Sequence, residues 1–246
     1  MADILPNMTK LAQDAPPHPF YPLEANIVGY LANEWSVPKL LGVFFAGCAV
    51  ELGITLLIVN RFNPTLRKGD KAALLWFVVS GTIHVFFEGY FAFNHATMPA
   101  MQDPFGQMWK EYAYSDSRYM TSDAFVLCME TSTAIFWGPL SYTVALMITT
   151  QHPLRYPLQA LVSLGQIYGD VLYYATSLFD HYFNKTTYFR PEAYYFWAYY
   201  FFLNFIWIVI PGILLVKSIR ATARAFQALE TQSAAQQTNG GSKKRN

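Results

Sequence analysis

The sequence predicts an all-α, polytopic membrane protein in which five transmembrane helices enclose an intramembrane pocket. The 246-residue chain is 53% hydrophobic, 17% aromatic and only 13% charged, whereas ordinary soluble domains carry about 25% charged residues. A bilayer is crossed by ~20 mostly apolar residues. Five stretches meet that length, namely 38–60, 72–95, 122–149, 157–180 and 193–216. Polar pairs at helical spacing interrupt three of these stretches, and they indicate a pocket.

Residues 1–35 are expected to form a lumenal segment that precedes the first span. They contain no positive start followed by a continuous apolar core, so a cleaved signal peptide is not expected. The stretch PPHPFYPLE at 16–24 holds too many prolines for a helix and predicts an extended lead-in. Glycosylation sequons occur at Asn7 and Asn184, and the second is expected to lie too close to the membrane to be modified.

Basic residues orient residues 36–218, the predicted transmembrane domain. The segments 61–71, 151–157 and 217–246 hold eleven of the 17 lysines and arginines. In a five-span topology they share one side, which the positive-inside rule makes cytosolic. Residues 219–246 are then a cytosolic, largely disordered basic tail. Its last four residues, KKRN, fit either a dilysine retrieval signal or an ordinary solvated tail. The formal net charge of +1 gives no reason to expect a nucleic-acid partner.

The second predicted span carries two ionisable groups in the stretch IHVFFEGYF. His84 and Glu88 lie four residues apart and share one helix face. Ionisable groups inside a membrane are costly and indicate a function by default. Taken alone, however, this pair fits a structural brace between helices equally well.

Two further spans repeat the pattern. Glu130 and Thr133 in METST lie three residues apart, as do Asn204 and Trp207 in NFIW. Each has a structural alternative, since the glutamate could pair with the histidine and an asparagine often joins membrane helices. Three such pairs in one small bundle favour a single buried polar chamber. Glu51 and Asp170 are further acids within predicted spans, without an obvious partner on the same face.

The residue types limit the chemistry of such a chamber. A metal centre is not expected, because the five histidines are scattered, and GxGxxG, Walker and haem-attachment motifs are absent, so no cofactor is expected either. Acids, bases and aromatic rings remain. A carboxyl group in apolar surroundings can keep its proton near neutral pH, and an indole face stabilises a cation. This combination predicts isomerisation of a hydrophobic alkene through a carbocation.

Several long stretches resemble the emopamil-binding protein family, the sterol 8,7-isomerases. They are IHVFFEGYF (83–91), QMWKEYAYSDSRYM (107–120), VLCMETSTAIFWGPLS (126–141), QHPLRYPLQ (151–159), VSLGQIYGDVLYY (162–174) and YYFWAYYFFLNFIWIVIPG (194–212). The resemblance runs from about residue 38 to 217, in order and without large gaps. It implies an endoplasmic reticulum enzyme that moves a sterol double bond from Δ8(9) to Δ7(8) without a cofactor.

The resemblance also implies roles for individual residues. The catalytic set would be His84, Glu88, Glu130 and Trp207, and the substrate-binding set Thr133 and Asn204. The WKEYAYSDSRY loop would add Trp109 and Tyr112 to the substrate-binding set, with Tyr119, as a cap over the chamber. A plain connector that does not touch the substrate is the alternative. Ion pairs among Lys110, Glu111, Asp116 and Arg118 would lock the loop.

The implied partners are a Δ8-sterol, cationic amphiphilic amines and the lipid bilayer. The implied location is the endoplasmic reticulum membrane, with the nuclear envelope as an extension of it. A homodimer and an association with a sterol reductase stay open. Two rival functions also stay open, a non-catalytic sterol or drug receptor of the same fold and a proton-coupled carrier. The complete acid, base and indole set favours an enzyme, and the lack of an inverted repeat speaks against a carrier.

Overall fold

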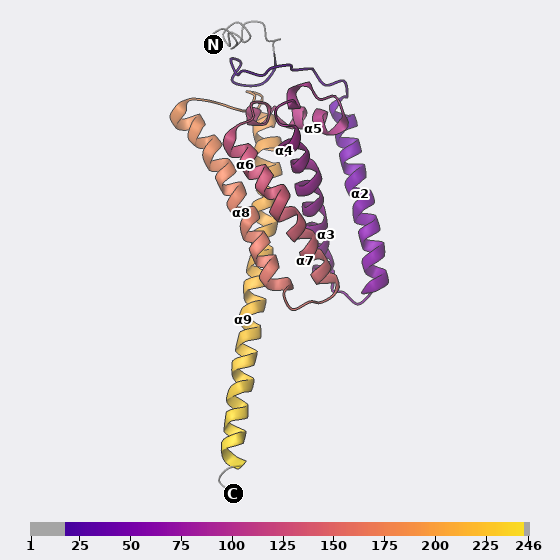
Figure 1. The fold of residues 1–246 in the computed structure, drawn as a ribbon, viewed down its shortest axis with the longest axis vertical. Helices are drawn as coiled ribbons and strands as arrows, with labels where there is room; N and C mark the ends of the chain where they lie inside the picture. The colour runs from indigo at the N-terminus through magenta and orange to yellow at the C-terminus, as the bar shows by residue number, and fades with distance from the viewer. Residues whose placement is uncertain (1–17, 244–246) are drawn as a thin grey trace, which may run out of the picture.

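The computed structural model describes residues 18–243, with side chains described through residue 236, and these residues form helices and turns but no strand (Figure 1). The all-α prediction is therefore confirmed for the described part of the chain. Asn7 and the end of the KKRN motif lie outside it. The principal elements are α2 (Val37–Phe62), α3 (Lys68–Thr82), η1 (Ile83–Glu88), α4 (Gly89–Asn94), η2 (Met98–Ala100), α5 (Pro104–Tyr112), η3 (Ser117–Met120), α6 (Ala124–Ser132), η4 (Thr133–Trp137), α7 (Gly138–Thr149), α8 (Arg155–Phe179), η5 (Asp180–Asn184), η6 (Tyr195–Phe202) and α9 (Leu203–Lys243).

Consecutive elements join into five helical stretches that coincide with the five predicted ranges. These stretches are α2, α3–η1–α4, α6–η4–α7, α8–η5 and η6–α9. Within the described part of the chain, three helices are long and apolar enough to cross a membrane, namely Val37–Phe62, Lys68–Asn94 and Tyr195–Gln236. Polar residues lower the mean hydropathy of the third and fourth stretches. Their crossing of a bilayer therefore stays a prediction.

The outer surface of the bundle is apolar. On α2, the exposed fractions of Phe45, Leu57 and Phe62 are 60%, 73% and 78%. A soluble monomer rarely presents such a continuous apolar face to water, whereas lipid accepts it. The interior, by contrast, buries small polar residues such as Ser80 and Ser141 completely. This arrangement fits helices whose outer faces meet lipid.

Two apolar clusters are stacked along the bundle, with a polar layer between them. One contains Phe91, Val126 and Tyr173. The other contains Phe77 and Val162, with Val144 and Leu214. Four helical stretches contribute residues to both clusters. Along each of these four, a polar or indole residue falls between the two clusters. Those residues are His84, Glu130, Gln166 and Trp207. The fold thus brings one group from each stretch to a common level.

A cap covers one end of the bundle, formed by α5 and the segment that precedes α2 (Figure 1). The Gln107 side chain ties them together, because its Oε1 accepts from the backbone N–H groups of Glu34 and Trp35, both at 2.8 Å. Asp103 caps α5 by accepting from Phe105 N and Gly106 N. The prediction of an extended lead-in agrees with the non-helical backbone of residues 18–36.

α9 continues beyond the bundle as one helix to Lys243 (Figure 1). Residues 219–243 are therefore helical where the sequence analysis expected a largely disordered tail. The stretch ATARAFQALETQSAAQQ is rich in alanine and other good helix formers and contains no proline or glycine. Intrinsic helix propensity is enough to account for the difference.

Two π-helical segments, η1 and η4, interrupt the second and third stretches and pack against each other. A π-turn inserts an extra residue into an α-helix, and such segments are frequent at functional sites. Here η1 carries His84 and Glu88, and η4 begins at Thr133, so the irregular turns hold residues that the sequence analysis singled out.

Candidate functional site

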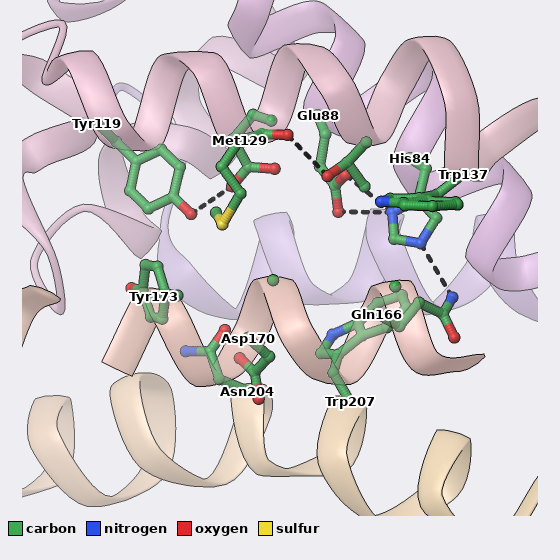
Figure 2. Close-up of a pocket in the computed structure, with 14 residues that line it drawn as sticks. His84, Glu88, Tyr119, Met129, Trp137, Gln166, Asp170, Tyr173, Asn204 and Trp207 are labelled. Carbon is green, nitrogen blue, oxygen red and sulfur yellow. Dashed lines mark hydrogen bonds and ion pairs between the residues drawn. The ribbon is translucent and has the colours of Figure 1, made fainter. Parts of the chain in front are cut away.

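The polar layer surrounds a cavity of about 80 Å³. Figure 2 shows the lining side chains projecting into it from helices on opposite sides. The lining residues are His84, Glu88, Tyr119, Met129, Glu130, Thr133, Trp137, Gly165, Gln166, Gly169, Asp170, Tyr173, Asn204 and Trp207. All three sequence-predicted pairs are therefore brought to one place.

His84 is held at both ring nitrogens. Its Nδ1 lies 2.9 Å and 2.8 Å from the two carboxylate oxygens of Glu88. Its Nε2 lies 3.1 Å from the amide nitrogen of Gln166 on α8. The imidazole is 3% exposed, so it is removed from bulk solvent. His84 therefore joins two helices through its contact with Gln166, and it also lines the cavity. The structural and the functional interpretation of the His84–Glu88 pair are thus compatible.

Glu130 faces the same group from α6. Its Oε1 accepts a hydrogen bond of 2.6 Å from the Tyr119 hydroxyl. Its carboxyl group lines the same two cavities as that of Glu88. Two carboxyl groups can share a hydrogen bond only if one of them carries a proton. Such a pair could hold and pass on one proton.

An indole ring from α9 lines the cavity and contacts a second indole ring from α3. The Trp207 ring centroid lies 4.9 Å from that of His84 and 5.0 Å from that of Trp76. An indole face carries negative potential and attracts a cation within ~6 Å. A positive charge that formed between the carboxyl groups and Trp207 would meet stabilising groups on both sides.

A second, larger cavity of about 320 Å³ adjoins the first. Ligand pockets commonly measure about 300–1,000 Å³. The two cavities share the residues Glu88, Tyr119, Glu130, Asn204 and Trp207. The rest of the larger wall is mostly apolar and comes from α2, α3, η1, α5 and α9, with Leu40, Leu41, Phe44, Trp76, Ile83, Phe87, Met108, Leu203 and Ile206. An apolar ligand in it would reach the acids at one end.

The cap residues also line this larger cavity. Trp109 donates from Nε1 to the Phe87 carbonyl at 2.9 Å. The Tyr112 hydroxyl donates to Asn204 Oδ1 at 3.1 Å, and Asn204 donates in turn to the Tyr200 carbonyl at 2.6 Å. The loop therefore contributes to the cavity wall, and its contact with a substrate stays a prediction.

Thr133 uses its hydroxyl hydrogen within its own helix, where it donates to the Met129 carbonyl at 2.8 Å. Its oxygen remains able to accept a hydrogen bond at the cavity surface. A ligand hydroxyl or a protonated carboxyl group could donate to it.

Of the ion pairs expected among the four charged residues of the loop, the one between Arg118 and Asp116 is present. Arg118 and Asp116 are 1% and 0% exposed and approach to 2.6 Å. Lys110 instead donates to the Leu31 carbonyl at 2.7 Å, and burial lowers its pKa to about 8. Glu111 accepts from the Tyr199 hydroxyl at 3.2 Å, and burial raises the pKa of its carboxyl group.

Glycines permit the close packing of the site. A Cβ on Gly138 would lie 2.5 Å from Val85 Cγ2, and one on Gly165 would lie 2.6 Å from the Trp137 ring. Both distances are below any ordinary carbon contact. Gly138 therefore lets the start of α7 approach η1, and Gly165 lets Trp137 pack onto α8.

The sequence analysis missed or ranked low several lining residues. Gln166 and Trp137 carry no charge, so nothing distinguished them from structural residues. Asp170 was noticed as an acid within a span but ranked low, because it has no obvious partner on its own helix face; it lines the smaller cavity from α8. Glu51, by contrast, lies outside both cavities and accepts a hydrogen bond from Thr82.

The family model described as EBP: EXPERA (EXPanded EBP superfamily) matches residues 104–218. The 3-beta-hydroxysteroid-Delta(8),Delta(7)-isomerase of Rattus norvegicus is 39% identical over 218 residues, which cover 88% of this chain and 94% of the rat protein. The chain belongs to the EBP family. The predicted resemblance is thus confirmed, and with it the expectation of an enzyme of the isomerase class.

Plant members of the EBP family are also similar to this chain. A probable 3-beta-hydroxysteroid-Delta(8),Delta(7)-isomerase of Oryza sativa subsp. japonica is 32% identical over 213 residues, covering 86% of this chain and 94% of the rice protein. The isomeliandiol synthase MOI2 of Melia azedarach is 34% identical over 197 residues, covering 76% of this chain and 90% of its own length. The family therefore includes proteins with different named products.

Proposed function

We propose that this protein is a sterol isomerase that moves a ring double bond from Δ8(9) to Δ7(8). The observation that carries this proposal is the meeting of two carboxyl groups, an imidazole and an indole at the end of a mainly apolar cavity. The names of the rat and rice relatives supply the substrate class. The alkene would enter the larger cavity with its reacting ring beside Glu88 and Glu130.

The reaction needs one proton and returns one. A protonated acid adds its hydrogen to carbon 9, and the electrons of the C8=C9 bond form the new C–H bond. Carbon 8 is left as a carbocation. A base then removes a hydrogen from carbon 7, and the electrons of that C–H bond form C7=C8. The sterol keeps its formula, so no cofactor is consumed.

Glu130 and His84 would act as a coupled proton-handling pair, with Glu88 between them. Glu88 would stabilise the cation or relay the proton that leaves carbon 7. The contact from His84 to Glu88, and the cavity that Glu88 shares with Glu130, support a connected set of three groups. Strongly interacting groups titrate as a set, so the first proton is assigned to the set rather than to one residue.

Trp207 would face the cation, and Asn204 and Thr133 would orient the sterol or the carboxyl groups. Trp109 and Tyr112 would cover the ligand from the cap. A pocket complementary to the transition state binds its analogues tightly. A cationic amphiphilic amine places a fixed positive charge where the carbocation forms. Such amines should therefore compete with the sterol for the same site.

The proposal also places the protein in the endoplasmic reticulum membrane. All five helical stretches would cross it, with the N-terminus lumenal and the C-terminus cytosolic. The outward apolar residues of α2 and the three apolar helices support a membrane location. The lysines and arginines of the 61–71 and 151–157 loops support the orientation. A sterol could then reach the cavity directly from the bilayer.

Incubation of the purified protein with a Δ8-sterol in heavy water tests the proposal. A Δ7 product that carries deuterium at carbon 9 is the expected result. Recovery of unchanged sterol, under conditions in which a cationic amine still binds, would instead establish the receptor function. A different rearranged product would point to the chemistry of relatives such as isomeliandiol synthase.

A further inference from the structure

We propose that Gln166 is a positioning residue for the reaction, because its amide can hold the His84 imidazole in both the neutral and the protonated state. This inference rests on the proposed isomerase function. Gln166 lies on α8, is 6% exposed, and approaches His84 Nε2 to 3.1 Å with its amide nitrogen. Figure 2 shows it across the cavity from the histidine backbone.

The two ring nitrogens of His84 have different partners. Nδ1 faces both oxygens of the Glu88 carboxyl group, from the same helix. Nε2 faces Gln166, from another helix. The partner of one nitrogen fixes which nitrogen carries the proton in the neutral ring. With Nδ1 donating to the carboxylate, Nε2 is an acceptor, and the Gln166 N–H supplies its hydrogen bond.

A proton-handling histidine also passes through the imidazolium form, in which both nitrogens donate. Gln166 can serve this form too, because an amide carries an acceptor oxygen beside its donor nitrogen. That oxygen has no hydrogen-bond partner among the described residues. Rotation of the amide by half a turn would offer it to the protonated Nε2. Neither a carboxylate nor a lysine could supply both hydrogen bonds.

Charge at His84 is controlled by other groups. Glu88 lies on its own helix, Glu130 faces it from α6, and Asp170 lines the same cavity from α8. Gln166 carries no charge, so its contribution is orientation. A misoriented acid or base slows the chemical step more than it weakens the binding of an apolar substrate. Loss of Gln166 should therefore lower kcat and leave KM nearly unchanged.

Gln166→Met keeps the length of the side chain and removes both hydrogen-bonding atoms. Gln159→Met is the matched control, because Gln159 lies on the same helix, is 2% exposed, and donates to the Leu214 carbonyl outside the cavities. With a Δ8-sterol, kcat of Gln166→Met is expected to fall about tenfold or more, with KM changed less than about twofold. The control is expected to keep kcat within about threefold of wild type.

Nitrogen NMR of histidine-labelled protein provides a readout that needs no substrate. The signals of His84 are assigned from their loss in His84→Gln. Wild type is expected to show a single neutral tautomer with Nδ1 protonated. Gln166→Met is expected to keep that tautomer, because Glu88 still holds Nδ1, and to shift the Nε2 signal, because the hydrogen bond to that nitrogen is lost. Gln166→Glu is the second variant should the methionine variant fold poorly. It should hold both ring nitrogens protonated at neutral pH and turn over slowly.

An unchanged Nε2 signal of His84 in Gln166→Met, or a kcat within about twofold of wild type, would overturn the inference. So would an equal effect in the Gln159→Met control. Failure of the wild-type protein to convert any Δ8-sterol would overturn the proposed function instead. The NMR comparison would then still decide whether Gln166 positions His84.

Discussion

The imidazole of His84 packs against the indole of Trp207 with ring centroids 4.9 Å apart, although the two residues belong to the second and fifth helical stretches. His84, Glu88 and Glu130, which we propose handle protons, thus line one cavity with the Trp207 face that would stabilise a cation. It also explains how acid–base chemistry and amine binding could use a single site.

Glu130→Gln tests the proton-handling set. The amide cannot donate a proton to an alkene, so turnover of a Δ8-sterol should fall by a factor of about 10³ or more. Glu51→Gln is the control, since Glu51 is another acid within a span but lies outside both cavities. It should keep most of the activity. Near-normal turnover by Glu130→Gln, measured on protein that still purifies from membranes, would contradict the proposed mechanism.

Trp207→Leu should weaken both turnover and the binding of a cationic amine. Loss of a cation–π contact in a dry site costs up to about 2 kcal/mol, or about 30-fold in either quantity. Trp197→Leu serves as the control because Trp197 is 61% exposed and lines neither cavity. Steady-state kinetics and amine titration measure the two effects. An effect on only one of them would argue against a shared site.

Gly165→Ala should destabilise the protein, because its Cβ would meet the Trp137 ring at 2.6 Å. Overpacking of this kind costs about 1–3 kcal/mol. Gly169→Ala, one turn later on α8, meets nothing within 4 Å and should be neutral or stabilising. Thermal unfolding in detergent compares them. Equal melting temperatures would mean that Trp137 can move aside freely.

Asp116→Asn should loosen the cap. It leaves Arg118 buried without its partner, and breaking a buried ion pair costs about 3–5 kcal/mol. Glu192→Gln is the matched control, because it removes a pair with Arg190 whose side chains are 39% and 25% exposed. Such exposed pairs contribute about 0–1 kcal/mol. The fall in melting temperature should therefore be much larger for Asp116→Asn, and similar falls would refute this account of the cap.

The lowered pKa of Lys110 predicts that the stability of the folded protein depends on pH. Its pKa is about 8 in the folded protein, against an ordinary value of 10.5, because burial disfavours the charged form. Between these values the unfolded chain binds more protons, so this group makes stability rise with pH. The melting temperature of wild type relative to Lys110→Met should rise from about pH 8 to 10. A constant difference across that range would show that Lys110 stays charged when folded.

Much of the architecture could be predicted from composition and length. Apolar runs separated by basic or polar turns specify helical stretches, since a chain in lipid must satisfy its backbone hydrogen bonds within each segment. The pairs of His84 with Glu88, Glu130 with Thr133, and Asn204 with Trp207 were also readable, because helical spacing puts each pair on one face. The alanine-rich stretch of the tail favours a helix that continues α9, although the sequence analysis expected disorder there.

The sequence by itself determined the helical segments, the apolar outer faces and the chemical types available to a site. Only the tertiary structure decided that the three polar pairs meet, and that Gln166 and Trp137 join them. Those two residues come from different helices and carry no charge, so no spacing rule reveals them. Their positions depend on how closely the helices approach each other. Gly138 and Gly165 permit this approach, because a Cβ atom at either position would collide with a neighbouring side chain. The helical periodicity of the sequence determines which residues share a helix face. Tertiary packing decides which residues of other helices that face contacts.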